Sequence, residues 1–435
     1  MRNPCLFFLI LSSLFSSGQN EGRTYQFKHL NTSDGLSQSS EIAMEQDNLG
    51  RMWLGTRDGL NLYDGSSFKI FRNLPADSTS ISNSDILCIK EDSEGYIWIG
   101  TYNGLNRYDQ SKDSFKRFYH YNDNNSLCDN SIWAIEETSD GKIWIGTSNG
   151  LSIYDKKDNH FTNFSEKGTK HKGNLPSNFV LNIKQANNGT IWLGTSKGFC
   201  KAIVDNQNKY EFQLFRSIFG KSEPFVQTLS VCDENTICVG TKNNGVLKFD
   251  LISERFLSAK VLNQNEDVRA IVPGESGQLW IGTSHGMISL QVNGTSEQVQ
   301  YDSNEQNGLS HNYIKSLFKD AKGSIWIGSY YGGIDIWDTS NNNFVNFNES
   351  TGKYRLSHKV VSSIAEDDQQ NLYFGTEGGG ITIFNIANGK TQYISTSNSK
   401  ILESDNIKSL LLDGDVLWVG TFNKGIETYN IANKA

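Results

Sequence analysis

Proline is scarce in this chain, with 5 prolines against 40 glycines in 435 residues. Apolar residues do not recur at the 3.6-residue period of a helix over any useful length, so few helices are expected. Aromatic residues, in contrast, make up 11% of the chain. Many glycines together with many aromatic residues indicate short strands joined by numerous tight turns.

The sequence also lacks the common motifs of catalysis and cofactor binding. It contains no HExxH metal motif, no GxSxG nucleophile elbow, no phosphate-binding loop and no CxxC pair. The net charge of −8 opposes binding to nucleic acid or to anionic lipid. Beyond the first residues, no segment is apolar enough to cross a membrane. We therefore expect no metal, no cofactor, no nucleic acid partner and no membrane span.

Residues 1–18 have the pattern of a signal peptide. A short basic start at Met1–Asn3 precedes the apolar stretch Leu6–Phe15, and the small residues Ser16–Gly18 follow it. The apolar stretch is too short to span a bilayer permanently. The pattern predicts a periplasmic or secreted protein. The alternative is that these residues form a disordered or buried N-terminal strand.

The cysteines do not form an obvious disulfide framework. After removal of residues 1–18, five remain, and they are scattered along the chain: Cys88, Cys128, Cys200, Cys232 and Cys238. Cys232 and Cys238 flank a short turn, so one alternative is that they face each other across a hairpin. The favoured interpretation is that all five are small buried hydrophobic residues.

One four-residue motif, Trp-Ile-Gly-Thr or Trp-Leu-Gly-Thr in its clearest form, recurs every 42 to 48 residues. Its nine copies begin at Trp53, Trp98, Trp144, Trp192, Cys238, Trp280, Trp326, Tyr373 and Trp418. The second copy shows how each unit is built, because short apolar runs alternate with turn residues. Its expected strands are residues 85–90, 96–101, 105–108 and 114–118. Such an antiparallel meander of four strands is one blade of a β-propeller, so the fold class is all-β.

The motif itself is expected to be structural. The second strand of each unit is apolar on both faces, as required when a blade lies between two neighbouring blades. The glycine within it, such as Gly55 or Gly100, allows an adjacent backbone or ring to approach closely. The preceding tryptophan is then expected to fill the wedge between blades rather than to bind a ligand.

The propeller is expected to cover residues 24–435, and its closure leaves two architectures open. The ninth repeat ends before a fourth strand, whereas Tyr25–Leu30 resembles fourth strands such as Phe115–Tyr119. We therefore expect the N-terminal strand to complete the last blade and to close a single ring of nine blades, which leaves no open edge. The alternative, favoured by ordinary propeller size, is a seven-bladed ring followed by two extra blades.

The repeat resembles the two-component regulator propeller repeat. The resemblance rests on residues 308–314 (GLSHNYI), on Asp320-x-x-Gly323 before the residues 325–328 (IWIG), and on residues 332–334 (GGI). It implies the periplasmic sensor region of a Bacteroidetes hybrid two-component histidine kinase, which detects oligosaccharides from glycan breakdown. This chain has no β-sandwich, membrane helix or kinase sequence, so it is expected to be a truncated sensor or a free-standing relative. The expected partners are an oligosaccharide and either a membrane histidine kinase or a second copy of the chain.

The candidate ligand site lies on one face of the propeller. The turns between second and third strands share that face with the loops between blades, around the central channel. A sugar site needs aromatic faces and planar polar groups. The candidates on this face are Arg57, Tyr102, Asn103, His285, Tyr330, Tyr331 and Phe422. The alternative for each is an ordinary solvated turn residue.

Two other functions remain open. Some propellers are polysaccharide lyases or hydrolases whose site residues converge from several blades, and carboxylates such as Asp58 and Glu377 are candidates for such convergence. Because catalytic motifs are missing, we nevertheless expect that the chain is not an enzyme. The other alternative is a scaffold that binds a protein partner.

Overall fold

The computed structural model describes residues 25–433, except residues 124, 168–173, 206–208, 216–222, 258–265, 306, 339–346, 350–353 and 400. The predicted signal peptide at residues 1–18 lies outside these residues. Within them, every regular element is a strand apart from one 3-10 turn, η1 (Thr32–Asp34). The strands form nine antiparallel sheets, which confirms the all-β fold and the blade as its unit.

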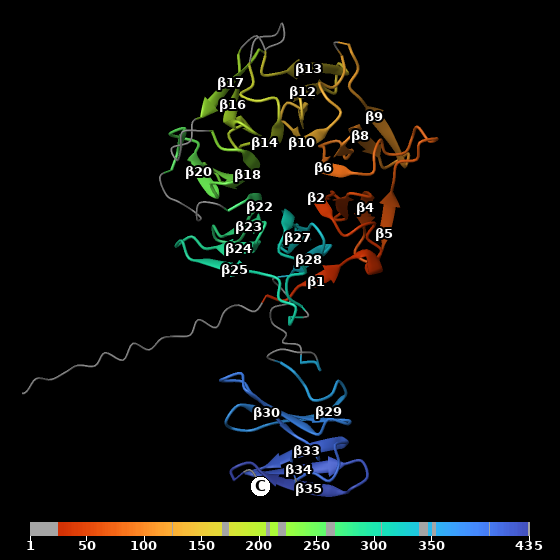
Figure 1. Cartoon of the computed structure of the whole chain (residues 1–435), viewed down its shortest axis with the longest axis vertical. Coiled ribbons are helices and arrows are strands. Elements are labelled where there is room, and N and C mark those ends of the chain that lie inside the picture. Colours follow the sequence, from red (N-terminus) through yellow and green to blue (C-terminus); the bar gives the residue numbers. More distant parts are fainter. Residues whose placement is uncertain are drawn as a thin grey trace, which may run out of the picture.

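The first seven sheets are blades in which strand position follows chain order from the ring axis outwards. The first strands are β2 (Glu41–Gln46), β6 (Ile86–Glu91), β10 (Ile132–Glu137), β14 (Val180–Gln185), β18 (Val226–Asp233), β22 (Val268–Pro273) and β26 (Ile314–Lys319). The second strands are β3 (Met52–Thr56), β7 (Ile97–Thr101), β11 (Ile143–Thr147), β15 (Ile191–Thr195), β19 (Thr236–Thr241), β23 (Leu279–Thr283) and β27 (Ile325–Ser329). In Figure 1 the first strands surround the centre of the ring.

The outer half of each blade contains the third and fourth strands. The third strands are β4 (Gly59–Tyr63), β8 (Gly104–Asp109), β12 (Gly150–Asp155), β16 (Gly198–Val204), β20 (Val246–Asp250), β24 (Gly286–Leu290) and β28 (Ile334–Trp337). The fourth strands are β5 (Phe68–Phe71), β9 (Ser114–Phe118), β13 (His160–Phe164), β17 (Tyr210–Phe215), β21 (Arg255–Phe256), β25 (Ser296–Val299) and, in the seventh blade, β1 (Lys28–Leu30).

The ring closes after seven blades, and the N-terminal strand completes the seventh. β1 pairs antiparallel with β28, with Lys28 opposite Ile336 and Leu30 opposite Ile334. β2 of the first blade packs against β26 and β27 of the seventh. The expected nine-bladed ring, with residues 25–30 on the ninth blade, is therefore wrong, and the seven-plus-two alternative is confirmed. The physical reason is that the edge of β28 accepts β1 once the first and seventh blades are in contact.

Close packing between blades depends on the glycine of the repeated motif. A Cβ added at Gly55 would lie 2.6 Å from the Cγ2 atom of Ile86, on the first strand of the next blade. The same position in the seventh blade, Gly328, faces Glu41 of the first blade. The predicted close approach is confirmed, and its partner is the residue that begins the neighbouring first strand. Around the ring this partner is apolar in six blades, as Ile86, Ile132, Val180, Val226, Val268 and Ile314, and is Glu41 at the seam.

The tryptophans of the motif lie in the wedges between blades, as predicted. In the ring they are buried, and several donate their indole N–H to an aspartate in the preceding turn. The Nε1 atom of Trp53 lies 2.9 Å from Asp47, and that of Trp98 lies 2.7 Å from Asp92. In the fourth blade the aspartate is replaced by Ala186, and the buried Nε1 atom of Trp192 has no hydrogen-bond partner among the described residues.

Substituting Ala186 with aspartate is expected to stabilise the fourth blade. The carboxylate would accept the indole N–H of Trp192, as Asp92 does for Trp98, and would satisfy a buried donor at a gain of about 1 kcal/mol. Urea unfolding followed by tryptophan fluorescence should show a higher midpoint for A186D than for the unsubstituted chain. The reciprocal variant D320A removes the acceptor of the Trp326 indole N–H and should show a lower midpoint. An unchanged or lower midpoint for A186D would contradict this role for the turn aspartate.

The fifth blade contains a disulfide between Cys232 and Cys238, which joins β18 to β19 with Cα atoms 6.0 Å apart. The interpretation of all five cysteines as unpaired hydrophobic residues is therefore wrong for this pair. Ser230 is the residue opposite Cys238, and Cys232 lies two residues further along β18, where the pairing register shifts between Val231 and Asp233. The other three, Cys88, Cys128 and Cys200, are free. Burial raises the pKa of the Cys88 and Cys200 thiols, which keeps them protonated.

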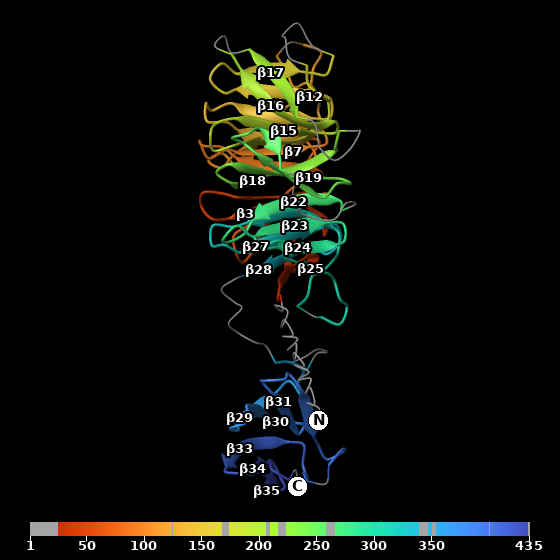
Figure 2. The ribbon, with the colours of Figure 1, turned by 90° about the vertical axis from the view of Figure 1, so that its left-hand side faces the viewer.

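The eighth and ninth repeats form two sheets outside the ring (Figures 1 and 2). The eighth comprises β29 (Val361–Glu366), β30 (Asn371–Thr376), β31 (Ile381–Asn385) and β32 (Thr391–Ile394), and the ninth comprises β33 (Ile407–Asp413), β34 (Val416–Thr421) and β35 (Ile426–Asn430). Gly375 contacts Ile407, so this pair repeats the blade-to-blade packing of the ring. On the ninth sheet Trp418 is 43% exposed, unlike its buried counterparts in the ring.

Candidate ligand site at the mouth of the channel

The site begins with a β-bulge in each innermost strand. In β26 the pairing register with β27 shifts between Ile314 and Ser316, so Lys315 is the extra residue, and the same shift occurs in all seven first strands. Bulges redirect a side chain away from the regular alternation of the strand. All seven bulged residues line the central channel, a cavity of about 610 Å³: Ile42, Leu87, Trp133, Leu181, Gln227, Arg269 and Lys315.

The bulges lie at the end of the channel where the turns between second and third strands were predicted to form a binding face. Antiparallel pairing places the start of each first strand beside the end of the second, as with Ile86 opposite Thr101. The turn backbone is fixed there, because the Tyr102 N–H donates to the Asp85 carbonyl at 3.3 Å. Likewise the Tyr330 N–H donates to the Tyr313 carbonyl at 3.0 Å. We call this end of the channel the mouth.

Aromatic side chains form an arc along one side of the mouth, from the second to the fifth blade. The rings of Tyr102 and Trp133 meet edge to face with centroids 5.6 Å apart. Trp133 meets Phe179 at 5.3 Å, and Phe179 meets Phe225 at 6.2 Å. We call these four residues the aromatic arc. Edge-to-face contacts of this kind are favourable and hold each ring in place.

Three cations lie on the opposite side of the mouth, in the sixth, seventh and first blades, whereas Lys242 lies over Phe225 of the arc with its Nζ atom 5.7 Å from the ring centre. Arg269 lies over the ring of Tyr313 at 4.3 Å, and Arg57 lies over the ring of Tyr330 at 5.1 Å. The Nζ atom of Lys315 lies 5.9 Å from the centre of the same Tyr330 ring. We call Arg57, Arg269 and Lys315 the cationic cluster. Burial, together with the like charges of Arg269 and Arg57, lowers the pKa of Lys315 to about 8.

The cations deeper in the channel are neutralised by carboxylates of neighbouring blades. Lys90 on β6 lies 2.6 Å from Glu45 on β2, and Lys184 on β14 lies 3.0 Å from Glu136 on β10. At the mouth, Arg269 is paired with Asp267. Lys315 and Arg57, in contrast, make no ion pair or side-chain hydrogen bond with any residue that the structure describes. At the mouth, therefore, two cations lack a carboxylate within ion-pair distance in the described residues.

Of the predicted site residues, Arg57, Tyr330 and Tyr331 are brought together across the seam between the first and seventh blades. Tyr330 contacts Tyr331 edge to face at 4.5 Å, and Tyr331 is 67% exposed. Tyr102 lies at the end of the aromatic arc. Next to it, Asn103 is exposed, and its backbone N–H donates to the Thr101 side chain at 3.1 Å.

The two remaining predicted residues lie further from these. His285 is exposed on the turn of the sixth blade, where its Nδ1 atom lies 3.7 Å from Glu266. Phe422 belongs to the ninth sheet and packs beneath Lys408, with Nζ 5.3 Å from the ring centre. Because the ring has seven blades, Phe422 is not part of its mouth. Its assignment to the same face as the others followed from the nine-bladed prediction.

The residues that sequence reasoning missed are the bulged ones, above all Trp133, Arg269 and Lys315. Their neighbours in the repeat are apolar or small in most blades, whereas the bulged position changes from isoleucine in the first blade to lysine in the seventh. That variability was visible in the aligned repeats. Its meaning was hidden, because regular strand alternation would not direct all these side chains to the channel.

The carboxylates considered for catalysis do not converge. Asp58 in the first blade is paired with Arg72 at 3.1 Å, and Glu377 in the eighth is paired with Lys408 at 2.6 Å. Across the described ranges, no three His, Cys, Asp or Glu side chains are grouped as metal ligands. In the same residues no helix has the length and apolarity needed to span a membrane.

The fold and the mouth define the class of this protein as a seven-bladed β-propeller with two further blades, all built on one repeat. Five repeats match the family described as Two component regulator propeller, at residues 80–103, 126–149, 174–197, 308–331 and 355–378. These five repeats match the family, which confirms the resemblance that their motifs predicted.

Its similarity to known proteins extends over nearly the whole chain. It is 44% identical over 432 residues to a protein named Histidine kinase P4 from Formosa agariphila, in a match that covers 97% of this chain and 31% of that protein. The chain therefore spans less than a third of that relative's length.

Solved structures from other bacteria share the fold. The extracellular domain of a protein assigned as a hybrid two component system from B. thetaiotaomicron has a TM-score of 0.70 and 26% identity, covering 94% of this chain and 54% of that one. A second extracellular domain from the same organism, assigned to a one component system, has a TM-score of 0.61 at 20% identity, covering 94% and 60%. Virginiamycin B lyase from Staphylococcus aureus shares the fold alone, with a TM-score of 0.54 at 14% identity over 72% of this chain and 99% of the lyase.

Proposed function

We propose that this chain is the extracytoplasmic ligand-binding region of a two-component sensor and that it recognises an oligosaccharide at the mouth of the ring. The observation that carries the proposal is the aromatic arc beside exposed polar groups at one end of a channel. Sugar rings present C–H groups to aromatic faces and hydroxyls to planar donors and acceptors. The similarity to extracellular domains of two-component systems supports the same assignment.

The chemistry of the mouth favours binding over turnover. Trp133 is held by its neighbours Tyr102 and Phe179 and by a hydrogen bond from its indole N–H to the Ser148 hydroxyl at 2.8 Å. A ring fixed in this way binds with little loss of side-chain entropy. Because Asp58 and Glu377 lie in different blades and each has a cationic partner, they do not supply the acid and base pair that glycoside cleavage needs. We therefore propose recognition without catalysis.

We further propose that this chain acts as part of a longer sensor with a histidine kinase, in one polypeptide or as a partner in the membrane. The relative named as a histidine kinase supports this, since the chain matches less than a third of it. The ninth sheet supports it too, because Trp418 is 43% exposed there, whereas the tryptophans at the same motif position in the ring are buried. Apolar sheet faces of this kind are normally covered in a propeller.

Replacing Trp133 with alanine is expected to weaken oligosaccharide binding at least tenfold, or about 1.4 kcal/mol. Isothermal titration of the full chain with neutral and acidic tetrasaccharides tests this, with sugar analysis to detect turnover. Trp418→Ala, on the ninth sheet, is the matched control and should bind normally. Trp133→Phe keeps an aromatic face and should retain most of the affinity.

Three results would count against the proposed function. The first is no binding to any tetrasaccharide, and the second is equal binding by W133A and the unsubstituted chain. The third is breakdown of the sugar during the titration, which would favour a lyase or hydrolase. Copurification of a membrane protein in the absence of glycan binding would favour a scaffold.

A further inference from the structure

We propose that the oligosaccharide recognised at the mouth is acidic and that its carboxylate or sulfate group binds between Lys315 and Arg57. This inference rests on the proposed function and narrows its ligand class. Its basis is the position of both cations beside one aromatic ring, Tyr330, at distances of 5.9 and 5.1 Å from the ring centre.

The lysines that line the channel differ in their ion pairs. Lys90 and Lys184 line the channel further from the mouth. Each lies within 3.0 Å of a glutamate from a neighbouring blade. The packing of blades thus provides a carboxylate for these internal cations. Lys315 occupies the same channel but has no carboxylate within ion-pair distance in the described part of the chain. An unpaired, partly buried ammonium group is unfavourable, and either loss of its proton or a counter-charge relieves the cost. Because the pKa of Lys315 is about 8, the ammonium form predominates at neutral pH, and a bound anion would stabilise it.

Two cations and one carboxylate act electrostatically on Lys315. Arg269 and Arg57 both act on it as like charges, and Asp267 is the acidic group that acts on it. Asp267 is already engaged by Arg269 and by the side-chain amide of Gln227. Asp85 faces Arg57, which favours the ionised carboxylate, while burial raises the pKa of that carboxyl group. Glu266 faces His285 instead. Lys315 therefore has two like-charged neighbours, and its one acidic neighbour is already engaged.

The donors of Arg57 and Lys315 suit a carboxylate or sulfate group. A guanidinium group binds carboxylate or sulfate oxygens through two parallel N–H bonds, and an adjacent ammonium group adds a third donor. Arg57 is exposed at the rim, whereas Lys315 is partly buried in the channel wall, so an anion between them would be partly shielded from water. Coulomb attraction is stronger in such a place than on an open surface.

An acidic sugar and a free anion would make different contacts at the mouth. The aromatic arc continues around the mouth from Tyr102 to Phe225, and the other bulged residues that line the channel there are Ile42, Leu87, Leu181 and Gln227. A free sulfate or phosphate ion would contact the cations but not the aromatic arc. An acidic oligosaccharide would use both, with a ring on the arc and a charged group at Lys315.

The experiment titrates the full chain with matched pairs of tetrasaccharides that differ only in charge. The acidic members are tetragalacturonate, a hyaluronan tetrasaccharide and a κ-carrageenan tetrasaccharide, and their partners are the carboxyl-reduced or desulfated forms. Cellotetraose, inorganic sulfate and inorganic phosphate complete the set. We expect an acidic member to bind at least tenfold more tightly than its neutral partner, with an affinity that falls as salt rises.

The matching variants are K315M, K315R and K319M. Lys319 ends the same strand, so K319M removes one positive charge from β26 without touching the mouth. We expect K315M to lose at least tenfold in affinity for the acidic sugar and to leave its neutral partner unaffected, while K315R and K319M bind normally. Unchanged thermal unfolding of K315M confirms that the variant folds.

The outcomes separate the two proposals. If neutral and acidic members bind equally and K315M has no effect, the acidic ligand class is wrong and the proposed sugar-binding function stands. If sulfate or phosphate alone binds as tightly as the acidic sugars, the mouth is a free-anion site and the acidic-sugar inference is overturned. If no tetrasaccharide binds, the proposed function itself is wrong.

Discussion

Replacing Glu41 with valine is expected to stabilise the ring, and by more at pH 8 than at pH 5. Glu41 is fully buried at the seam between the first and seventh blades, where the other six blades have isoleucine or valine. One of its carboxyl oxygens bonds the Ser316 hydroxyl, and the other has no partner in the described structure. Valine already occupies the equivalent position in the fourth blade, where Val180 packs on Gly146 of the third. A valine at position 41 is therefore expected to fit the wedge in the same way.

The pH dependence follows from the proton on Glu41. Burial raises its pKa from 4.5 to about 8, although the Ser316 hydroxyl and the Ala43 backbone act in the opposite direction. Between these values the folded chain holds a proton that the unfolded chain has released, so stability falls as pH rises. The slope from this group is about 1.4 kcal/mol per pH unit. The stability is fully present below pH 4.5 and is lost by about pH 8. The valine variant has no such group and escapes this loss.

Urea unfolding of both proteins at several values between pH 5 and pH 8 measures the effect. The difference in unfolding free energy should grow by several kcal/mol across that range. The double variant E41V/S316A removes the hydroxyl left without its acceptor and matches the alanines at positions 134 and 270. E211V, at an exposed position of β17, is the control and should show no growing difference. A constant difference between E41V and the unsubstituted chain would show that Glu41 is ionised in the folded protein.

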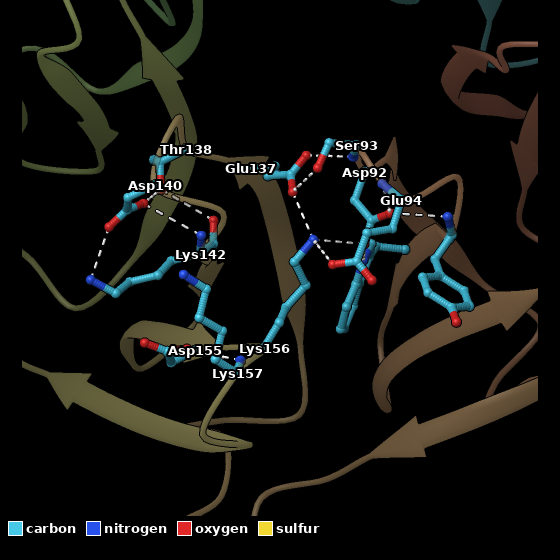
Figure 3. Close-up of polar contacts among 12 residues, drawn as sticks. Asp92, Ser93, Glu94, Glu137, Thr138, Asp140, Lys142, Asp155, Lys156 and Lys157 are labelled. Carbon is cyan, nitrogen blue, oxygen red and sulfur yellow. Dashed lines mark hydrogen bonds and ion pairs between the residues drawn. The ribbon is translucent and has the colours of Figure 1, made fainter.

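Replacing Lys156 with methionine is expected to destabilise the ring by about 3 kcal/mol. Lys156 follows β12 in the third blade and joins that blade to the second (Figure 3). Its Nζ atom lies 2.7 Å from Glu137, 2.9 Å from Glu94 and 3.3 Å from Asp92. The Asp92 side chain is fully buried, and that of Glu137 is 13% exposed. Removing the lysine leaves both carboxylates with little access to water and no cation.

The neighbouring Lys157 provides the control, because its side chain is exposed. Equilibrium urea unfolding should give a lower midpoint for K156M and an unchanged midpoint for K157M. Equal midpoints for the two variants would mean that the contacts of Lys156 contribute no more than an ordinary surface ion pair.

The blades could be predicted from the sequence, but the size of the ring could not. Period, strand order and the roles of Trp53 and Gly55 all follow from local patterns repeated nine times. Ring size depends on the angle between neighbouring blades, which many small side-chain contacts determine together. β1 has the pattern of any fourth strand, and the missing strand of the ninth repeat was visible in the sequence. Nothing comparable marked the edge of β28 as open.

The candidate site was predictable in part for the same reason. Turn residues such as Tyr330 and Arg57 stand out because turns vary while strands do not, and they do lie at the mouth. Lys315 and Trp133 were overlooked because their place in the channel depends on a bulge that regular alternation hides. Phe422 was included only because the ninth repeat was assigned to the same ring.

The most direct test of the account is a crystal structure of this chain with the tetrasaccharide that binds most tightly. We expect the sugar at the mouth of the seven-bladed ring, with a ring against Trp133 and a charged group between Lys315 and Arg57. A sugar bound to the outer edges of the blades, to the opposite end of the channel or to the eighth and ninth sheets would contradict the account.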